Sequence, residues 1–218
     1  MYNKPTIRIV DTNFAHGKAL GCGDLNIPPT KFNYYRGNEQ IGDIVLITDS
    51  CLQSALQLKE KIKIAWLLEP ACVHPQLYSI ENVNILSKHF SLVLTHNKQL
   101  LELNPQKFLF YPYAGCWIYP HDWKIYNKTI QVSIIASHKR QTEGHRLRHL
   151  AISMLGNKIQ GVYGNAYTFI NYKLDALRDY RYSIVIENEK SDYWFTEKLI
   201  DCFATGTVPI YYGCPSIG

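Results

Sequence analysis

The segment that decides the fold is YSIVIENEKSDYWFTEKLIDCFATGTVPIYYG, residues 182–213. Its two ends, 182–188 and 207–213, are apolar β-branched runs of strand length, and the stretch 196–205 between them has helical spacing. Gly206 follows that stretch, at the place where a left-handed cap ends a helix. Near-continuous apolar strands are buried on both faces, which is typical of parallel strands covered by helices. The segment therefore predicts a strand, a helix and a second, parallel strand.

The same alternation extends over the rest of the chain. Apolar runs predict strands at 7–10, 43–48, 62–68, 90–95, 108–113, 131–137 and 158–164. Helical spacing predicts helices at 50–59, after an Asp49 or Ser50 cap, and at 97–103, 143–155 and 174–179. Strands that alternate with helices specify parallel sheets with right-handed crossovers, so an α/β fold is predicted.

The segment WIYPHDWKIYNK, residues 117–128, follows neither the strand nor the helix period and separates two series of strands. We interpret it as the crossover between two lobes, 1–120 and 121–218. Two parallel sheets that face each other would form a cleft between these lobes. The sequence ends at CPSIG without a helix after the last strand, so the second lobe is expected to be incomplete at its C-terminus or covered by a partner.

Composition narrows the class of protein. The 218 residues are 46% hydrophobic and 19% charged, and the net charge of +5 suits an anionic ligand. The absence of a long basic run disfavours nucleic-acid binding, and no GxGxxG motif supports a Rossmann dehydrogenase.

Six cysteines without a CxxC pair argue against a zinc site and favour reduced thiols. No stretch approaches the ~18 apolar residues of a membrane span, so a cytoplasmic chain is expected. Peripheral membrane association and the oligomeric state stay open.

Polar residues gather where the last predicted strands and helix meet. Ligands of open α/β sheets bind at the carboxyl ends of strands, and helix N-termini attract phosphate. Glu197 can accept hydrogen bonds from both hydroxyls of a ribose, Lys198 can pair with a diphosphate, and Asn188 can hold the loop or touch the ligand. A Glu-Lys pair at a helix start is also commonly just solvated charge near the helix dipole.

The order of these pieces resembles the donor-binding signature of the α-1,3-fucosyltransferases, glycosyltransferase family 10. The matching pieces are Ile186-Glu187-Asn188, Tyr193-Trp194-Phe195, Thr196-Glu197-Lys198, Gly206-Thr207-Val208-Pro209-Ile210 and Gly213-Cys214-Pro215. The resemblance covers most of residues 62–218 and implies a GT-B-like fold. It also implies ribose binding by Glu197, diphosphate binding by Lys198, and donor contacts by Asn188 and Trp194, a position where the family more often has Tyr. Glu187 and Tyr193 are secondary candidates.

Residues 133–155 are similar to the strand, loop and arginine-bearing helix of that family. In the family an arginine before an apolar helical stretch pairs with the diphosphate, which places this role at Arg148, with Arg146 as the close rival. The planar fork of an arginine binds phosphate oxygens in pairs, so the residue type suits the role.

A candidate base ends the predicted strand IKIAWLLEP in the first lobe. Glu69 follows this apolar strand near Trp66, where partial desolvation would raise its pKa and make it a better base near neutral pH. Family members end the same strand in a Glu that is assigned as the general base. His74 is the alternative base.

The resemblance implies a hexosyltransferase that moves fucose from GDP-fucose to a hydroxyl of an oligosaccharide acceptor with inversion. Such an enzyme is expected to need no obligatory cofactor, and the sequence has no DxD pair or His/Cys cluster that demands a metal. A retaining transferase is a rival, because Glu189 and Glu197 have an E-x7-E spacing. A catalytically silent module that binds a nucleotide sugar or a glycan is the second rival.

Overall fold

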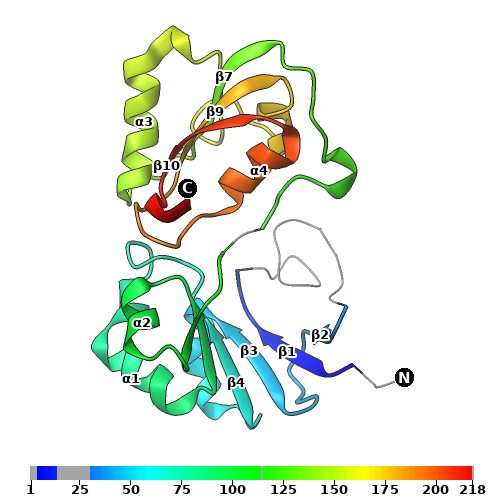
Figure 1. Cartoon of the computed structure of the whole chain (residues 1–218), viewed down its shortest axis with the longest axis vertical. Helices are drawn as coiled ribbons and strands as arrows, with labels where there is room; N and C mark the ends of the chain where they lie inside the picture. Colours follow the sequence, from blue (N-terminus) through cyan, green and yellow to red (C-terminus); the bar gives the residue numbers. More distant parts are fainter. Residues whose placement is uncertain (1–3, 14–29, 114, 218) are drawn as a thin grey trace. The chain divides into compact units, whose positions relative to one another are not determined.

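The computed structural model describes residues 4–13, 30–113 and 115–217. The chain divides into two compact units, Met1–Pro112 and Tyr113–Gly218, and Figure 1 shows both. The crossover segment 117–128 lies in the second unit. Each unit contains one parallel sheet, so the prediction of an α/β protein with two Rossmann-like units is confirmed.

The first unit is built on a six-stranded sheet in the order β2-β1-β3-β4-β5-β6. Its strands are β1 (Thr6–Val10), β2 (Asn33–Tyr35), β3 (Ile44–Thr48), β4 (Ile62–Trp66), β5 (Leu92–Thr95) and β6 (Phe108–Phe110). Its helices are α1 (Ile80–His89), α2 (Lys98–Leu103) and the 3₁₀ helices η1 (Asp49–Gln57) and η2 (Pro75–Tyr78). The core joins apolar side chains of the central strands to those of the helices, among them Val45, Ile47, Leu67, Leu86 and Phe90.

Among the elements of this unit, β2, α1 and η2 are not predicted by the sequence. β2 is only three residues long and has no apolar run, and α1 buries only Leu86 completely, so its apolar period is weak. The cap predicted at Asp49 or Ser50 is wrong. The segment forms a 3₁₀ helix without a side-chain cap, because the Asp49 carboxylate accepts the N–H of Leu68 instead.

The second unit has a four-stranded parallel sheet in the order β10-β9-β7-β8. Its strands are β7 (Ile130–Ile135), β8 (Gly161–Tyr163), β9 (Tyr180–Ile186) and β10 (Val208–Tyr212). Its helices are α3 (Glu143–Leu155), α4 (Glu197–Thr205) and the 3₁₀ helices η3 (Pro120–Asp122), η4 (Gly156–Lys158), η5 (Lys173–Ala176) and η6 (Pro215–Ile217). The helix predicted at 174–179 is thus only a short 3₁₀ turn.

The two long helices of this unit begin and end as the sequence predicts. α4 follows a Thr196 cap and ends at Gly206, which has the left-handed φ of 67° and ψ of 25°. Right-handed crossovers that run in opposite directions along a sheet place their helices on opposite faces. α3 leads from β7 to β8 and α4 from β9 to β10, and Figure 1 shows the two helices on either side of the strands.

Strand order locates the place where a ligand would bind. In the second unit the chain goes from β7 to β8 on one side and then crosses to β9 on the other side. Ligands of open α/β sheets bind beyond the carboxyl ends of the strands at such a switch point. A ligand site is therefore expected at the loops that follow β7 and β9.

Candidate donor-binding site

A cavity of about 400 Å³ lies at this switch point, within the range of about 300–1,000 Å³ that small-molecule sites occupy. Its lining includes Ser137, Lys139, His145, Arg148, Lys173, Ile186, Asn188, Glu197, Lys198 and Asp201. These residues come from the ends of β7 and β9, from α3 and α4, and from η5. The structure thus brings four of the predicted donor residues, Arg148, Asn188, Glu197 and Lys198, around one cavity.

The start of α3 is fixed against the loop that follows β9. The Thr142 hydroxyl accepts the N–H of His145 at 3.2 Å, and His145 Nδ1 accepts the N–H of Thr142 at 3.3 Å, which completes a capping box. Gly144 donates its N–H to the carbonyl of Asn188 at 3.2 Å. A Cβ at Gly144 would collide with the carbonyl of Glu187, so this close approach requires glycine.

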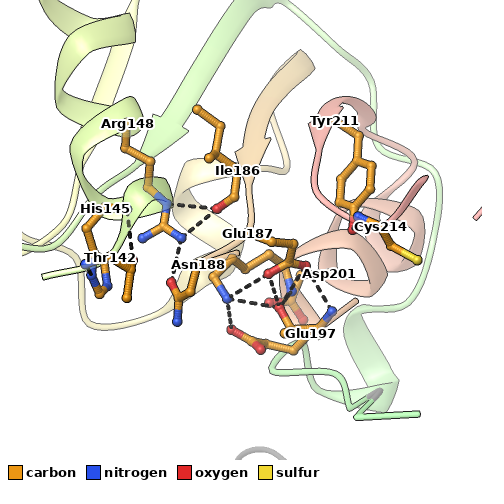
Figure 2. A network of polar contacts seen from close by, with 12 residues as sticks. Thr142, His145, Arg148, Ile186, Glu187, Asn188, Glu197, Asp201, Tyr211 and Cys214 are labelled. Carbon is orange, nitrogen blue, oxygen red and sulfur yellow. Dashed lines mark hydrogen bonds and ion pairs between the residues drawn. The ribbon is translucent and has the colours of Figure 1, made fainter. Parts of the chain in front are cut away.

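Arg148 ties α3 to the end of β9. Its Nε donates to the carbonyl of Ile186 at 2.9 Å, and its Nη2 donates to Asn188 Oδ1 at 2.9 Å (Figure 2). Burial lowers the pKa of Arg148, while the carboxylates of Glu187 and Glu197 oppose that shift. The guanidinium stays charged, because the ordinary pKa of arginine is far above neutrality. The rival Arg146 donates to the carbonyls of residues 140 and 141 and does not line the cavity.

Glu187 joins the end of β9 to the start of α4. Its fully buried carboxylate accepts the N–H of Thr196 at 2.9 Å and the hydroxyl of Thr196 at 2.8 Å. Lys198 Nζ lies 3.2 Å from the same carboxylate. Neither Glu187 nor Thr196 lines the cavity, so their observed contacts hold Lys198 and the helix start in place.

Glu197 belongs to a network of alternating charges, part of which Figure 2 shows. Lys173 Nζ lies 3.1 Å from Glu197 Oε1 and 3.0 Å from Asp201 Oδ2, and Asp201 also accepts the N–H of Trp117 at 2.6 Å. Burial raises the pKa of Glu197, but the positive charges of Lys173 and Lys198 outweigh burial and hold it well below its usual range. Glu197 is therefore a fixed, ionised acceptor at the cavity wall.

The aromatic loop before α4 packs Trp194 into the interior of its unit. The Trp194 side chain is fully buried and does not line the cavity, so its donor contact stays a prediction. Tyr193 has a left-handed φ of 62°, and its N–H donates to the Ser216 hydroxyl at 3.0 Å.

The cavity wall also contains residues that the sequence does not single out as candidates, among them His145, Lys173 and Asp201. His145 lies three residues after Thr142, which is the position that completes a capping box, so a signal was present. Lys173 has no local signal, because its partner Glu197 lies 24 positions later in the chain.

The candidate base Glu69 lies in the first unit, three residues after the end of the strand β4. Its N–H donates to Asp49 Oδ2 at 3.3 Å, and its carbonyl accepts the Tyr78 hydroxyl at 2.7 Å. Asp49 is buried and has an unusual positive φ of 31°. His74, the alternative base, makes a 3.2 Å contact with Gln76 through Nδ1. Both base roles stay predictions.

The described residues contain no group of three or more His, Cys, Asp or Glu side chains that could hold a metal ion. Their cysteines, Cys51, Cys72, Cys116, Cys202 and Cys214, are free, and Cys22 lies outside the described part of the chain. None of the helices described here is long and apolar enough to cross a membrane.

Comparison with solved structures gives the fold a known counterpart. The chain is similar to a crystal structure of an alpha1,3-fucosyltransferase, with 16% identity and a TM-score of 0.57 over 99% of this chain and 70% of that one. Crystal structures of an alpha1,3-fucosyltransferase with GDP and with GDP-fucose match at 15% and 17% identity and TM-scores of 0.58 and 0.57. They cover 99% and 100% of this chain, and 70% and 71% of theirs.

No family model and no curated protein sequence matches the chain. The resemblance to α-1,3-fucosyltransferases that the sequence motifs indicate is thus confirmed at the level of the fold. The chain has the α/β fold of these enzymes.

Proposed function

We propose that this chain is a glycosyltransferase that moves fucose from GDP-fucose to a hydroxyl of an oligosaccharide acceptor with inversion. The observation that carries the proposal is the cavity at the switch point of the second unit, where Arg148 and Lys198 supply positive charge and Glu197 supplies a carboxylate. The shared fold of alpha1,3-fucosyltransferase structures with GDP and GDP-fucose supports the choice of donor.

The cavity residues divide between the parts of the donor. Lys198 and Arg148 pair with the diphosphate, because cations give short charge-assisted hydrogen bonds to phosphate oxygens. Glu197 uses Oε1 for Lys173, and its other oxygen accepts a ribose hydroxyl. Asn188, which Arg148 holds at 2.9 Å, lines the same cavity as Arg148, Glu197 and Lys198.

The reaction is a single displacement. Glu69 takes the proton of the acceptor hydroxyl, whose oxygen attacks the anomeric carbon. The bond from that carbon to the diphosphate breaks, and GDP leaves with the electron pair. A positioned base typically contributes about a hundred- to ten-thousand-fold to the rate. Arg148 and Lys198 meet the negative charge that grows on the departing phosphate.

The test is an assay of the chain with GDP-fucose and a panel of oligosaccharide acceptors. We expect release of GDP and a fucosylated product whose anomeric configuration, read by NMR, is inverted relative to the donor. An absence of transfer with every acceptor, in a chain that still binds GDP-fucose, would instead support the silent binding module.

The retaining alternative depends on the pair Glu189 and Glu197. Glu197 lines the cavity and Glu189 does not, which favours inversion. A retained anomeric configuration in the product would eliminate the base role of Glu69 and revive the pair.

A further inference from the structure

His145 carries a hydrogen-bonding group that neither the fold nor the helix cap uses. The residue is the third of α3, is 8% exposed and lines the cavity. Its Nδ1 lies 3.3 Å from the backbone nitrogen of Thr142. A backbone N–H can only donate, so Nδ1 is the acceptor and carries no proton. The neutral ring therefore holds its proton on Nε2.

Nε2 makes no hydrogen bond to any residue that the structure describes, although the side chain is more than nine-tenths buried. Nε2 is not among the fully buried unpartnered atoms of the described residues, so this donor is open to the cavity, where a ligand oxygen can accept its hydrogen bond. Burial, together with the positive charges of Arg148, Lys139 and Lys198 and the neighbouring His149, lowers the pKa of His145 to about 4. The ring is thus neutral at physiological pH.

We propose that His145 binds the diphosphate of the nucleotide donor and gives a phosphate oxygen a hydrogen bond from the neutral Nε2–H. The inference rests on the proposed function, because it needs a diphosphate in this cavity. A neutral donor suits a site that already holds the cations Arg148 and Lys198, since a further cation would add repulsion in the empty site. The capping box fixes the ring before the ligand arrives, so little freedom is lost on binding.

Three substitutions separate this role from the helix cap. His145→Glu keeps an acceptor for the Thr142 N–H, and Glu is the common residue at this position of a capping box, but its carboxylate cannot donate. His145→Gln keeps the acceptor and has an amide donor. His145→Ala removes both. His149→Ala is the matched control, because His149 is equally buried one turn later on α3 but does not line the cavity.

The measurement is calorimetric titration with GDP, with guanosine titrated by NMR as the ligand that lacks phosphate. We expect His145→Ala to weaken GDP binding about tenfold or more and His145→Glu to weaken it further, in line with the ~1.5–3 kcal/mol of a hydrogen bond to a charged group. His145→Gln and His149→Ala should stay within about threefold of the wild type. Guanosine affinity should be the same in all variants.

His145→Ala with GDP affinity within about twofold of the wild type, in a protein whose thermal melt shows a folded chain, would overturn the inference. If that variant does not fold, equal GDP affinities of His145→Gln and His145→Glu would overturn it. A wild-type chain that binds GDP no better than guanosine would instead remove the proposed diphosphate site, so the two failures are distinguishable.

Discussion

The two units of this chain share a strand order but differ in the charge that they place at the carboxyl ends of their strands. The orders β2-β1-β3-β4 and β8-β7-β9-β10 are equivalent. In both, the second strand of the chain lies on one side of the first strand, and the third and fourth strands lie on its other side. In the first unit the residues at these carboxyl ends include the acids Asp11, Asp49 and Glu69, together with Arg36 after β2. In the second unit the cations Arg148 and Lys198 line the cavity.

In the first unit Asp49 is held by neutral hydrogen-bond donors, whereas Asp11 also pairs with Arg36 at 3.0 Å. Asp49 accepts the N–H groups of Leu68 and Glu69 and the side-chain amide of Asn13 at 2.7 Å. Burial raises the pKa of Asp49. Asp11 accepts the Thr48 hydroxyl at 2.6 Å. This arrangement holds the backbone of the candidate base in one place.

Every carboxylate near the cavity of the second unit has a cation beside it. Lys198 lies 3.2 Å from Glu187, and Lys173 lies 3.1 Å from Glu197 and 3.0 Å from Asp201. One strand order can therefore support different chemistry in the two units, because function depends on the side chains at the strand ends and not on the fold. The acidic end suits removal of a proton, and the cationic end suits a diphosphate.

The largest expected effect concerns the acidic end. Glu69→Gln should lower transfer from GDP-fucose by about a hundred- to ten-thousand-fold, because the amide cannot take the proton, while GDP affinity stays unchanged. Initial rates and calorimetry on the same preparations measure the two quantities. Glu102→Gln, on the exposed side of α2, is the matched control and should leave both unchanged. Transfer that survives Glu69→Gln and is lost in His74→Gln would move the base to His74.

A smaller effect is expected when the charge network of the second unit is broken. Lys173→Met leaves the buried carboxylate of Asp201 without its cation and leaves Glu197 with Lys198 alone, at 3.6 Å. Breaking a buried pair typically costs about 3–5 kcal/mol, and we expect about 2 kcal/mol here because 27% of the Lys173 side chain is exposed. Urea unfolding measures this change in the free energy of unfolding. Lys190→Met removes an exposed charge and should change it by less than about 0.5 kcal/mol.

If Lys173→Met proves as stable as Lys190→Met, the network contributes nothing to stability. The cations of the second unit would then matter for ligand binding and not for folding.

The smallest effect is a loss of stability in mild acid. Burial lowers the pKa of His96 in the first unit and of His145 in the second to about 4, below the ordinary value of about 6.5. The unfolded chain binds these protons near pH 6.5 and the folded chain only near pH 4. Stability is therefore full above about pH 6.5 and falls as the pH drops toward 4, by roughly 2 kcal/mol for each group at pH 5.

Urea unfolding at a series of pH values measures this slope. The difference between the wild type and His96→Gln isolates one histidine from the buried acids Asp49 and Asp201, whose raised pKa values act in the opposite direction. His121→Gln, an exposed control, should keep the wild-type slope. A slope that is the same in His96→Gln and in the wild type would contradict the assignment to His96.

Much of the second unit could be predicted from its sequence, because its signals are local. The threonine caps before α3 and α4 and the glycine after α4 lie within a few residues of the helices they bound. Four donor residues could be placed at one cavity because parallel strands end at the same edge of a sheet. The roles of Lys173 and Asp201 could not be predicted, since their pairing depends on tertiary packing between distant segments.

Burial could not be predicted either. The resemblance implies a donor contact by Trp194, whereas the structure packs this side chain inside its unit. In the first unit, β2 and α1 escaped prediction because neither has a strong apolar period.

The central claim is that the cationic end of the second unit binds a guanosine diphosphate. Calorimetric titration of the wild type and Lys198→Met with GDP and UDP tests it most directly, with Lys190→Met as the control for a lost charge. We expect the wild type to bind GDP more tightly than UDP. Lys198→Met should weaken GDP binding about a hundredfold, the cost of losing one partly buried charge-assisted partner, whereas Lys190→Met should not. Equal affinities for GDP and UDP, or GDP binding that Lys198→Met leaves intact, would contradict it.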